Sequence, residues 1–212
     1  MLALARHKDY HGACIVVSLQ TTHEIPRSKS KTYVCLGATI PVPWVFKNTE
    51  EIDDFPVFAK PNIWQGSQGT RVISDRRHLE FIKEQRNNYI ITEYLPGPEY
   101  TIDCFSDRDE VMLFCGGRER VRTRTGISVR SKRADNDLFG DFAERISQHL
   151  IFYGACFFQM KRDSVGTLKL PEVAEKCGVL MLDLSMLKLP IDDTGQEPMG
   201  KSALSILCTM RL

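Results

Sequence analysis

Long apolar runs are absent from this chain, since none approaches the roughly 20 apolar residues that a membrane-spanning helix needs. The apolar start, Met1 to Ala5, is followed at once by Arg6 and is too short for a signal peptide. The seven cysteines are scattered, with no Cys-x-x-Cys pair and no Cys/His cluster of zinc spacing. That distribution excludes a disulfide framework and predicts reduced thiols. We therefore expect a cytoplasmic protein with no membrane partner.

Net charge is also nearly absent, at +1 over 212 residues with a pI of about 7.6. A dedicated nucleic-acid binder with a globally basic surface is thereby excluded. The charge is unevenly placed, however, because residues 118–133 carry +6 and the rest of the chain carries −5. This imbalance indicates a local anion site. Internal repeats and low-complexity tracts are absent, and a 42% hydrophobic composition is enough for a buried core in one or two domains.

The order of predicted elements, strands in runs with two or three helices, indicates an α+β fold. Helices are expected at residues 31–37, 74–85 and 138–150, with Ser74 as the cap of the second and Leu79 and Ile82 facing inward. Strands are expected at residues 14–18, 55–60, 72–73, 89–95, 99–106, 111–125, 155–161 and 167–173. Prolines make residues 40–46 extended.

A glycine-flanked loop follows an apolar strand that ends at Lys60. Gly66 and Gly69 let the backbone turn tightly and direct N–H groups at an anion, while Lys60 supplies a positive charge. The spacing matches neither the Walker loop nor the dinucleotide fingerprint. From these residues alone the segment is either a phosphate-binding loop or a plain hairpin turn.

Two carboxylates, Glu93 and Glu99, lie at the ends of a strand, a Pro-Gly turn and a second strand. The backbone at the end of the first strand could contact an adenine edge, and Glu99 could accept hydrogen bonds from ribose hydroxyls. The alternative is a hairpin with solvated carboxylates at its mouth.

Four arginines recur with period two, which predicts that all project from one face of a strand. They are Arg118, Arg120, Arg122 and Arg124. Recognition of a phosphate or carboxylate would relieve their repulsion. A solvated basic edge strand and an RNA-binding strand are the alternatives, although no aromatic residues are interleaved for stacking.

Gln159 and Glu172 flank a predicted turn at residues 163–166. If paired residues have numbers that sum to an odd value, both side chains point to the same face, about 5 Å apart when directly opposite. Such oxygen ligands can hold Mg²⁺ together with phosphates and water. The alternative is an ordinary polar pair on a half-exposed sheet.

Taken in order, these motifs resemble the ATP-grasp superfamily, specifically the carbamoyl-phosphate-synthase-like carboxylate ligases, over residues 28–176. Phe-Pro-Val-Phe-Ala-Lys-Pro at 55–61 resembles the strand with the phosphate-binding lysine, and Gln-Gly-Ser-Gln-Gly at 65–69 resembles the glycine loop. Thr-Glu-Tyr-Leu-Pro-Gly-Pro-Glu-Tyr-Thr-Ile-Asp at 92–103 resembles the adenine hinge and ribose carboxylate. The segment 27–33 resembles the entry to the grasp, and residues 158–160 and 168–173 resemble the two metal-bearing strands.

The resemblance implies two small antiparallel-sheet lobes with flanking helices, the small lobe at about 45–92 and the large lobe at about 93–178. Residues 1–27 would be the remnant of a preceding α/β domain, and residues 179–212 an unmatched tail, so that the chain looks truncated at both ends. Implied nucleotide-binding residues are Lys29, Lys60, Gly66, Ser67, Gln68, Gly69, Glu93, Tyr94, Leu95 and Glu99. Implied metal ligands are Gln159 and Glu172. Arg122 and Arg124 are the candidate catalytic residues.

The implied function is an ATP-dependent, Mg²⁺-dependent ligase that activates a small carboxylate as an acyl phosphate for attack by an amine or another nucleophile. ATP and Mg²⁺ are the implied cofactors, and no nucleic-acid partner is expected. The chain departs from the family at Ala174, Glu175 and Lys176, where the family usually has Asn, Pro and Arg, and at Pro171. A catalytically impaired remnant that binds nucleotide only is therefore the alternative function.

Overall fold

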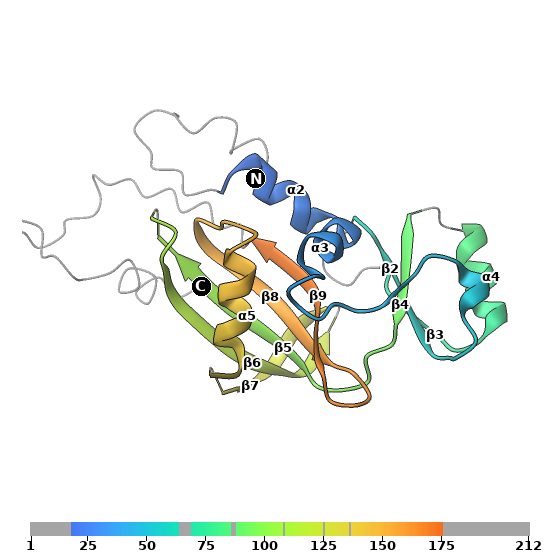
Figure 1. The fold of residues 1–212 in the computed structure, drawn as a ribbon. Coiled ribbons are helices and arrows are strands. Elements are labelled where there is room, and N and C mark those ends of the chain that lie inside the picture. Colours follow the sequence, from blue (N-terminus) through green and yellow to red (C-terminus); the bar gives the residue numbers. More distant parts are fainter. Residues whose placement is uncertain are drawn as a thin grey trace, which may run out of the picture. The chain divides into compact units, whose positions relative to one another are not determined.

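Two antiparallel sheets organise the computed structural model (Figure 1), which describes residues 18–63, 69–85, 88–107, 109–124, 126–135 and 137–175. The helices are α2 (Gln20–Arg27), α3 (Lys29–Leu36), the 3-10 helix η1 (Thr49–Glu51), α4 (Arg76–Gln85) and α5 (Asp137–Ser147). The strands are β1 (Val45–Phe46), β2 (Val57–Pro61), β3 (Arg71–Ile73), β4 (Tyr89–Glu93), β5 (Glu99–Ser106), β6 (Met112–Arg124), β7 (Ile127–Arg133), β8 (Gly154–Arg162) and β9 (Leu168–Glu175). The described residues all belong to one of the two compact units into which the chain divides. The predicted α+β class is confirmed.

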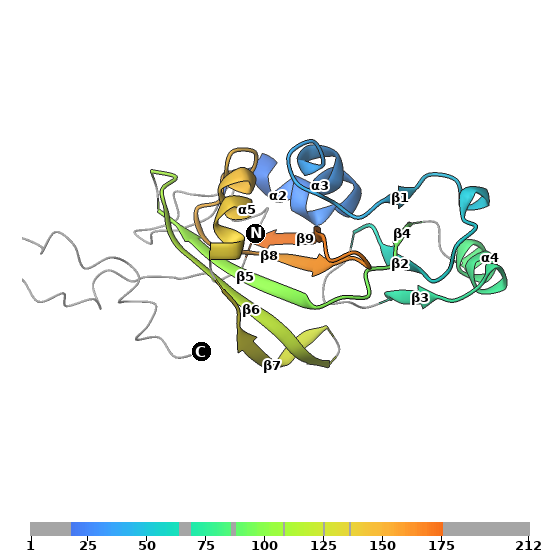
Figure 2. The ribbon, with the colours of Figure 1, turned by 60° about the horizontal axis from the view of Figure 1, so that its bottom comes forward.

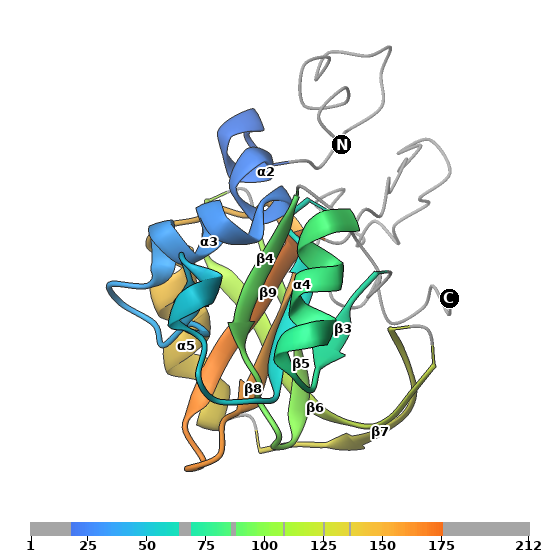
Figure 3. The ribbon, with the colours of Figure 1, turned by 90° about the vertical axis from the view of Figure 1, so that its right-hand side faces the viewer.

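The first sheet has the strand order β1-β4-β2-β3, and helix α4 lies beside it (Figure 3). Val72 and Ile73 pair with Phe58 and Val57, which confirms the predicted return strand. Helix α4 is capped by Asp75, whose carboxylate accepts the His78 N–H at 2.8 Å, so the prediction of Ser74 as the cap was wrong by one residue. The core between this sheet and α4 contains Ile52, Val57, Ala59, Ile73, Leu79, Ile82 and Ile91. Leu79 and Ile82, the two residues predicted to face inward, are among them.

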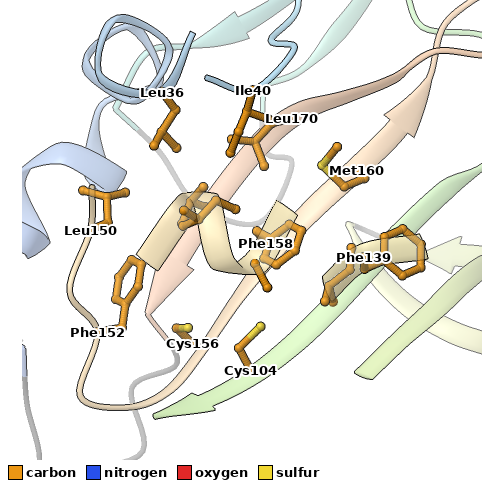
Figure 4. Packing of buried hydrophobic residues seen from close by; sticks show 14 of the residues in the cluster. Leu36, Ile40, Cys104, Phe139, Leu150, Phe152, Cys156, Phe158, Met160 and Leu170 are labelled. Atoms are coloured by element: carbon orange, nitrogen blue, oxygen red, sulfur yellow. The ribbon is translucent and has the colours of Figure 1, made fainter. Parts of the chain in front are cut away.

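The second sheet has the order β7-β6-β5-β8-β9, and helices α2, α3 and α5 lie against one of its faces (Figure 2). Phe139, Ala143 and Ile146 recur at helical spacing on α5 and are buried against the sheet. Phe139 lies directly over Gly117 of β6, where an added Cβ would meet its ring at 2.5 Å, so this contact requires glycine. Figure 4 shows the resulting core, in which Phe158, Met160 and Leu170 of β8 and β9 are fully buried.

Strand β7 and helix α2 were not predicted. Helix α2 contains Pro26, a residue that argues against helix in a sequence, yet it lies in the last turn. The strand expected at residues 14–18 lies outside the described residues, apart from its last member. The four cysteines among the described residues, Cys35, Cys104, Cys115 and Cys156, are free thiols. No helix in the described part of the chain is long and apolar enough to cross a membrane.

Candidate nucleotide site

Lys60, at the end of β2, is buried with only 5% of its surface exposed. Its Nζ donates to the Tyr33 hydroxyl of α3 at 2.6 Å and to the Pro171 carbonyl of β9 at 3.3 Å. The same tyrosine donates to that carbonyl at 2.8 Å, which closes a triangle of three polar groups. The ammonium also lies 5.2 Å from the centre of the Tyr33 ring. One lysine is thus held where β2, α3 and β9 meet.

Charges of both signs converge on this buried ammonium. Burial, followed by the nearby positive charge of Lys29, lowers the pKa of Lys60 to about 7, although Glu172 and Glu99 oppose the shift and Lys161 adds to it. Burial likewise lowers the pKa of Lys29, and Glu172 again opposes the shift. Buried lysines whose charged forms are disfavoured favour a bound anion, because a negative charge beside them stabilises the ammonium forms. The electrostatics therefore suit an anion.

The lowered pKa of Lys60 makes stability depend on pH. Between pH 7 and 10.5 the unfolded chain keeps the Lys60 proton that the folded protein has lost. We therefore expect the free energy of unfolding to rise with pH across this window, by about 1 kcal/mol per pH unit, and this contribution to be flat below pH 7. Urea titrations from pH 6 to 10 on the wild type and on Lys60→Met would measure it as the difference between the two proteins. Parallel pH profiles would contradict the prediction.

Gln159 of β8 and Glu172 of β9 are direct cross-strand partners, so the prediction that both point to one face is confirmed. The residue numbers 159 and 172 sum to an odd value only because β9 has one extra residue between this pair and the turn, where paired numbers have an even sum. The burial pattern shows the extra residue, since core-facing Leu170 and Val173 are three positions apart rather than two. Pro171 lies within this shift on an edge strand, where its missing N–H is tolerated.

This pair fits Mg²⁺ as a partial ligand set. Gln159 supplies an amide oxygen and Glu172 a carboxylate, and phosphate and water oxygens would have to complete the octahedron. No cluster of three or more His, Cys, Asp or Glu residues able to hold a metal is present within the described ranges. Ala174, two residues beyond Glu172 on the same face, offers no ligand. The site is thus suited to a metal that arrives with phosphates.

The end of β4 is fixed by Glu93. Its carboxylate accepts the Trp44 N–H at 2.6 Å and pairs with Lys169 Nζ of β9 at 2.6 Å, while its own N–H donates to the Trp44 carbonyl. Lys169 also lies 3.4 Å from Asp163. Partial burial disfavours the ammonium, but these two carboxylates raise the pKa of Lys169 overall. Glu93 is therefore held by both sheets.

Tyr94 and Leu95 form the link between β4 and β5, with the first half-buried and the second buried. Just after them, the Gly97 N–H donates to the Arg162 carbonyl at 3.0 Å and the Arg162 N–H donates to the Pro98 carbonyl at 3.1 Å. These two hydrogen bonds to β8 position the backbone of the predicted adenine hinge.

Glu99 begins β5 and lies between two cations. It pairs with Arg120 Nη1 of β6 at 2.6 Å and with Lys161 Nζ of β8 at 3.6 Å. The Arg120 side chain is 5% exposed, and its other terminal nitrogen donates to the Gly126 carbonyl. The carboxylate predicted to contact ribose thus lies within ion-pair distance of two cations.

The arginine strand pairs irregularly with β7 around Arg122. Arg120 pairs with Ser131 of β7, whereas Arg122 pairs with Arg130, so Val121 is an extra residue in β6. Thr123 then pairs with Ser128, so Val129 is an extra residue in β7 and the earlier register returns. Arg118, Arg120 and Arg124 therefore share one register with β7, and only Arg122 lies between the two shifts.

Arg122 and Arg124 are both exposed. Arg118 lies on the Glu99 face with Arg120 and pairs with Asp103 at 3.2 Å. The catalytic role expected of Arg122 and Arg124 stays a prediction, whereas Arg120 is the arginine that contacts Glu99.

The glycine loop is described only at its last residue. Gly69 has a φ of 78°, in the region that favours glycine, and its carbonyl accepts the Tyr89 hydroxyl at 2.7 Å. Gly66, Ser67 and Gln68 lie outside the described residues, so their expected phosphate contacts stay predictions.

Three residues of this cluster were missed: Tyr33, Lys161 and Lys169. The first two carry a detectable signal, because Tyr33 lies four residues after Lys29 on one helix face and Lys161 alternates with Gln159 along one strand. Lys169 has no such signal, since its pairing with Glu93 depends on how the two sheets meet.

Two antiparallel sheets that bring lysines, a carboxylate–amide pair and a strand-end hinge together constitute an ATP-grasp fold. A protein-family profile described as "ATP-grasp in the biosynthetic pathway with Ter operon" matches residues 85–178. The chain has the ATP-grasp fold and is similar in sequence to members of that superfamily over this segment.

Curated relatives include carbamoyl phosphate synthase large chains. The chain is 28% identical over 103 residues to that of Clostridium botulinum strain Langeland and 26% identical over 107 residues to that of Clostridium perfringens strain SM101. These matches cover 45% and 47% of this chain, but it spans only 10% of the length of either relative.

Similar solved structures share the fold at low sequence identity. The biotin carboxylase domain of 2-oxoglutarate carboxylase from Hydrogenobacter thermophilus, complexed with MgADP and bicarbonate, has a TM-score of 0.70 at 16% identity, covering 84% of this chain and 46% of that one. N5-carboxyaminoimidazole synthetase from Staphylococcus aureus, with ADP, has a TM-score of 0.61 at 17% identity, covering 71% and 45%. An L-amino acid ligase from Bacillus licheniformis has a TM-score of 0.57 at 21% identity, covering 76% and 43%.

Proposed function

We propose that the chain binds ATP with Mg²⁺ and activates a small carboxylate as an acyl phosphate, which an amine or another nucleophile then attacks. The observation that carries this proposal is the buried Lys60 ammonium, whose pKa is lowered to about 7 beside Lys29 and opposite Glu172. Such an arrangement is costly unless an anion with its counter-ion occupies it.

The chain's residues take defined roles in this proposal. Lys60 and Lys29 balance phosphate charge, and Glu99 accepts hydrogen bonds from ribose hydroxyls while its ion pair with Arg120 holds it in place. Gln159 and Glu172 hold the metal. Bound Mg²⁺ would neutralise charge that develops on the transferring phosphoryl group.

The adenine would lie against the backbone of Glu93 to Leu95, which the contacts with Trp44 and Arg162 hold in place. In the proposed reaction the substrate carboxylate oxygen bonds to the γ-phosphorus and ADP leaves, and the nucleophile then displaces phosphate from the acyl carbon. The protein acts mainly by positioning and charge neutralisation. A cytoplasmic location remains part of the proposal.

Carboxylate-dependent release of ADP tests this function. The purified chain would be incubated with MgATP and a panel of acids that includes bicarbonate and L-amino acids, with hydroxylamine added to trap an acyl phosphate as a hydroxamate. We expect one class of acid to raise ADP release well above the rate without acid, with a matching yield of hydroxamate where the acid allows it. Nucleotide binding without acid-dependent ADP release would contradict the ligase activity.

A further inference from the structure

Strands β6 and β7 form a ribbon, here named the basic ribbon and defined as residues 118–124 and 127–133. Two of its cations, Arg118 and Arg120, are neutralised by Asp103 and Glu99 of β5. Five further cations of the ribbon are exposed: Arg122, Arg124, Arg130, Lys132 and Arg133. The single acid of the ribbon, Glu119, is the direct partner of Lys132.

Like charges face each other across the basic ribbon. Arg122 is the direct partner of Arg130, and Arg118 is the direct partner of Arg133. Like charges directly opposite each other destabilise a strand pair, since their side chains are close neighbours. The ribbon has no carboxylate directly opposite Arg122 or Arg130. An anionic partner bound there would offset the repulsion between the two arginines.

The outer edge of β7 is open in the part of the chain that the structure describes. Strand β7 is the last strand of its sheet, and six of its seven residues are exposed. Val121, Ile127 and Val129 are 47%, 67% and 54% exposed, so apolar side chains accompany the cations. An edge strand with unpaired N–H and C=O groups is a template for another extended chain.

These features favour a peptide over a nucleic acid. Residues 118–133 contain no aromatic side chain on which bases could stack. An open strand edge offers a ladder of backbone hydrogen bonds, which a peptide can complete and a nucleic acid cannot. The exposed valines and isoleucine suit the alternating side chains of a bound strand.

We propose that the basic ribbon binds an acidic peptide segment, which adds in extended conformation to the outer edge of β7. Carboxylates of the peptide pair with Arg122 and Arg130, which are direct cross-strand partners. Backbone hydrogen bonds to β7 fix its direction, and apolar side chains of the peptide contact Val129.

Binding of a designed acidic strand tests the proposal. The probe is a fluorescein-labelled decapeptide of alternating Glu and Val, measured by fluorescence anisotropy at low salt and at about 0.15 M salt. We expect saturable binding that weakens with salt. Replacing Arg122 and Arg130 together by Ser should weaken it by about tenfold or more, since each exposed ion pair contributes up to about fivefold.

Matched controls separate charge, strand pairing and folding. Arg77→Ser removes an equally exposed arginine from α4 beside the other sheet and should leave the affinity unchanged. The same peptide with alternate backbone nitrogens methylated should lose most of its affinity. The Arg122→Ser, Arg130→Ser protein should unfold at the wild-type temperature or above, because a like-charge pair has been removed.

Three results would overturn the proposal. They are wild-type affinity in the ribbon variant, equal binding of the methylated peptide, and complete displacement of the probe by an oligouridylate of equal charge that itself binds more tightly. The last result would assign the ribbon to RNA.

Discussion

Replacing Lys60 by methionine should abolish the stabilisation that MgATP gives the folded protein. At 100 times its dissociation constant, nucleotide should stabilise the wild type by about 2.7 kcal/mol, which raises the thermal midpoint by several degrees for a domain of this size. In Lys60→Met the shift should fall to near zero, because the charge that neutralises phosphate has been removed from a site with few water contacts. Differential scanning calorimetry with and without MgATP would measure both values.

The same variant should be more stable than the wild type when nucleotide is absent. Methionine has nearly the length of lysine, and it removes an ammonium whose pKa burial has already lowered to about 7. The control is Lys47→Met, which removes an exposed lysine near the first sheet and should keep the full nucleotide shift. A nucleotide shift retained in Lys60→Met would refute the assignment of the phosphate site.

Glu172→Gln should abolish turnover while leaving the fold intact. The amide keeps the size of the side chain and one oxygen, but it removes the single carboxylate of the Gln159–Glu172 pair, so Mg²⁺ affinity should fall sharply. We expect acid-dependent release of ADP to drop by at least about 100-fold, on the scale of losing one preorganised electrostatic contact in a transition state. The measurement is the initial rate of ADP release at saturating MgATP, repeated over a series of Mg²⁺ concentrations.

A matched substitution keeps this test specific. Glu144→Gln makes the same chemical change at an exposed position of helix α5 and should retain the wild-type rate. A partial recovery of the Glu172→Gln rate at high Mg²⁺ would support a metal ligand. A rate that is low and independent of Mg²⁺ would instead assign Glu172 to charge balance at Lys29 and Lys60.

Much of the fold followed from local patterns, because those patterns record burial directly. The strand at 99–106 was predicted at its observed bounds, and the helix around Phe139 was placed by its apolar spacing. Strand β7 was missed because six of its seven residues are exposed, so the strand has no buried face to produce an alternation of apolar and polar residues. Helix α2 was missed because it combines Pro26 with a polar sequence.

The candidate site was predictable only in part. Gln159 and Glu172 share a face as the sequence suggested, but the extra residue in β9, and not the turn, gives their numbers the odd sum. The irregular pairing around Arg122 could not be predicted, since the regular alternation of Arg and other residues gives no sign of it. The contact of Lys60 with Pro171 joins segments 111 positions apart, a distance at which sequence spacing carries no information.

The extra residue in β9 has a consequence for how this chain tolerates change. Next to the turn, paired positions of β8 and β9 sum to 330, and beyond the shift they sum to 331. If the intact chain kept the even sum along the whole hairpin, Pro171 would lie opposite Gln159 and every later side chain of β9 would exchange faces. The carboxylate of Glu172 would then turn toward Phe158 in the core. Deleting Pro171 would instead remove the extra residue and leave Glu172 opposite Gln159 in a regular hairpin. The register at this point, as much as residue identity, specifies which chemistry the sheet displays.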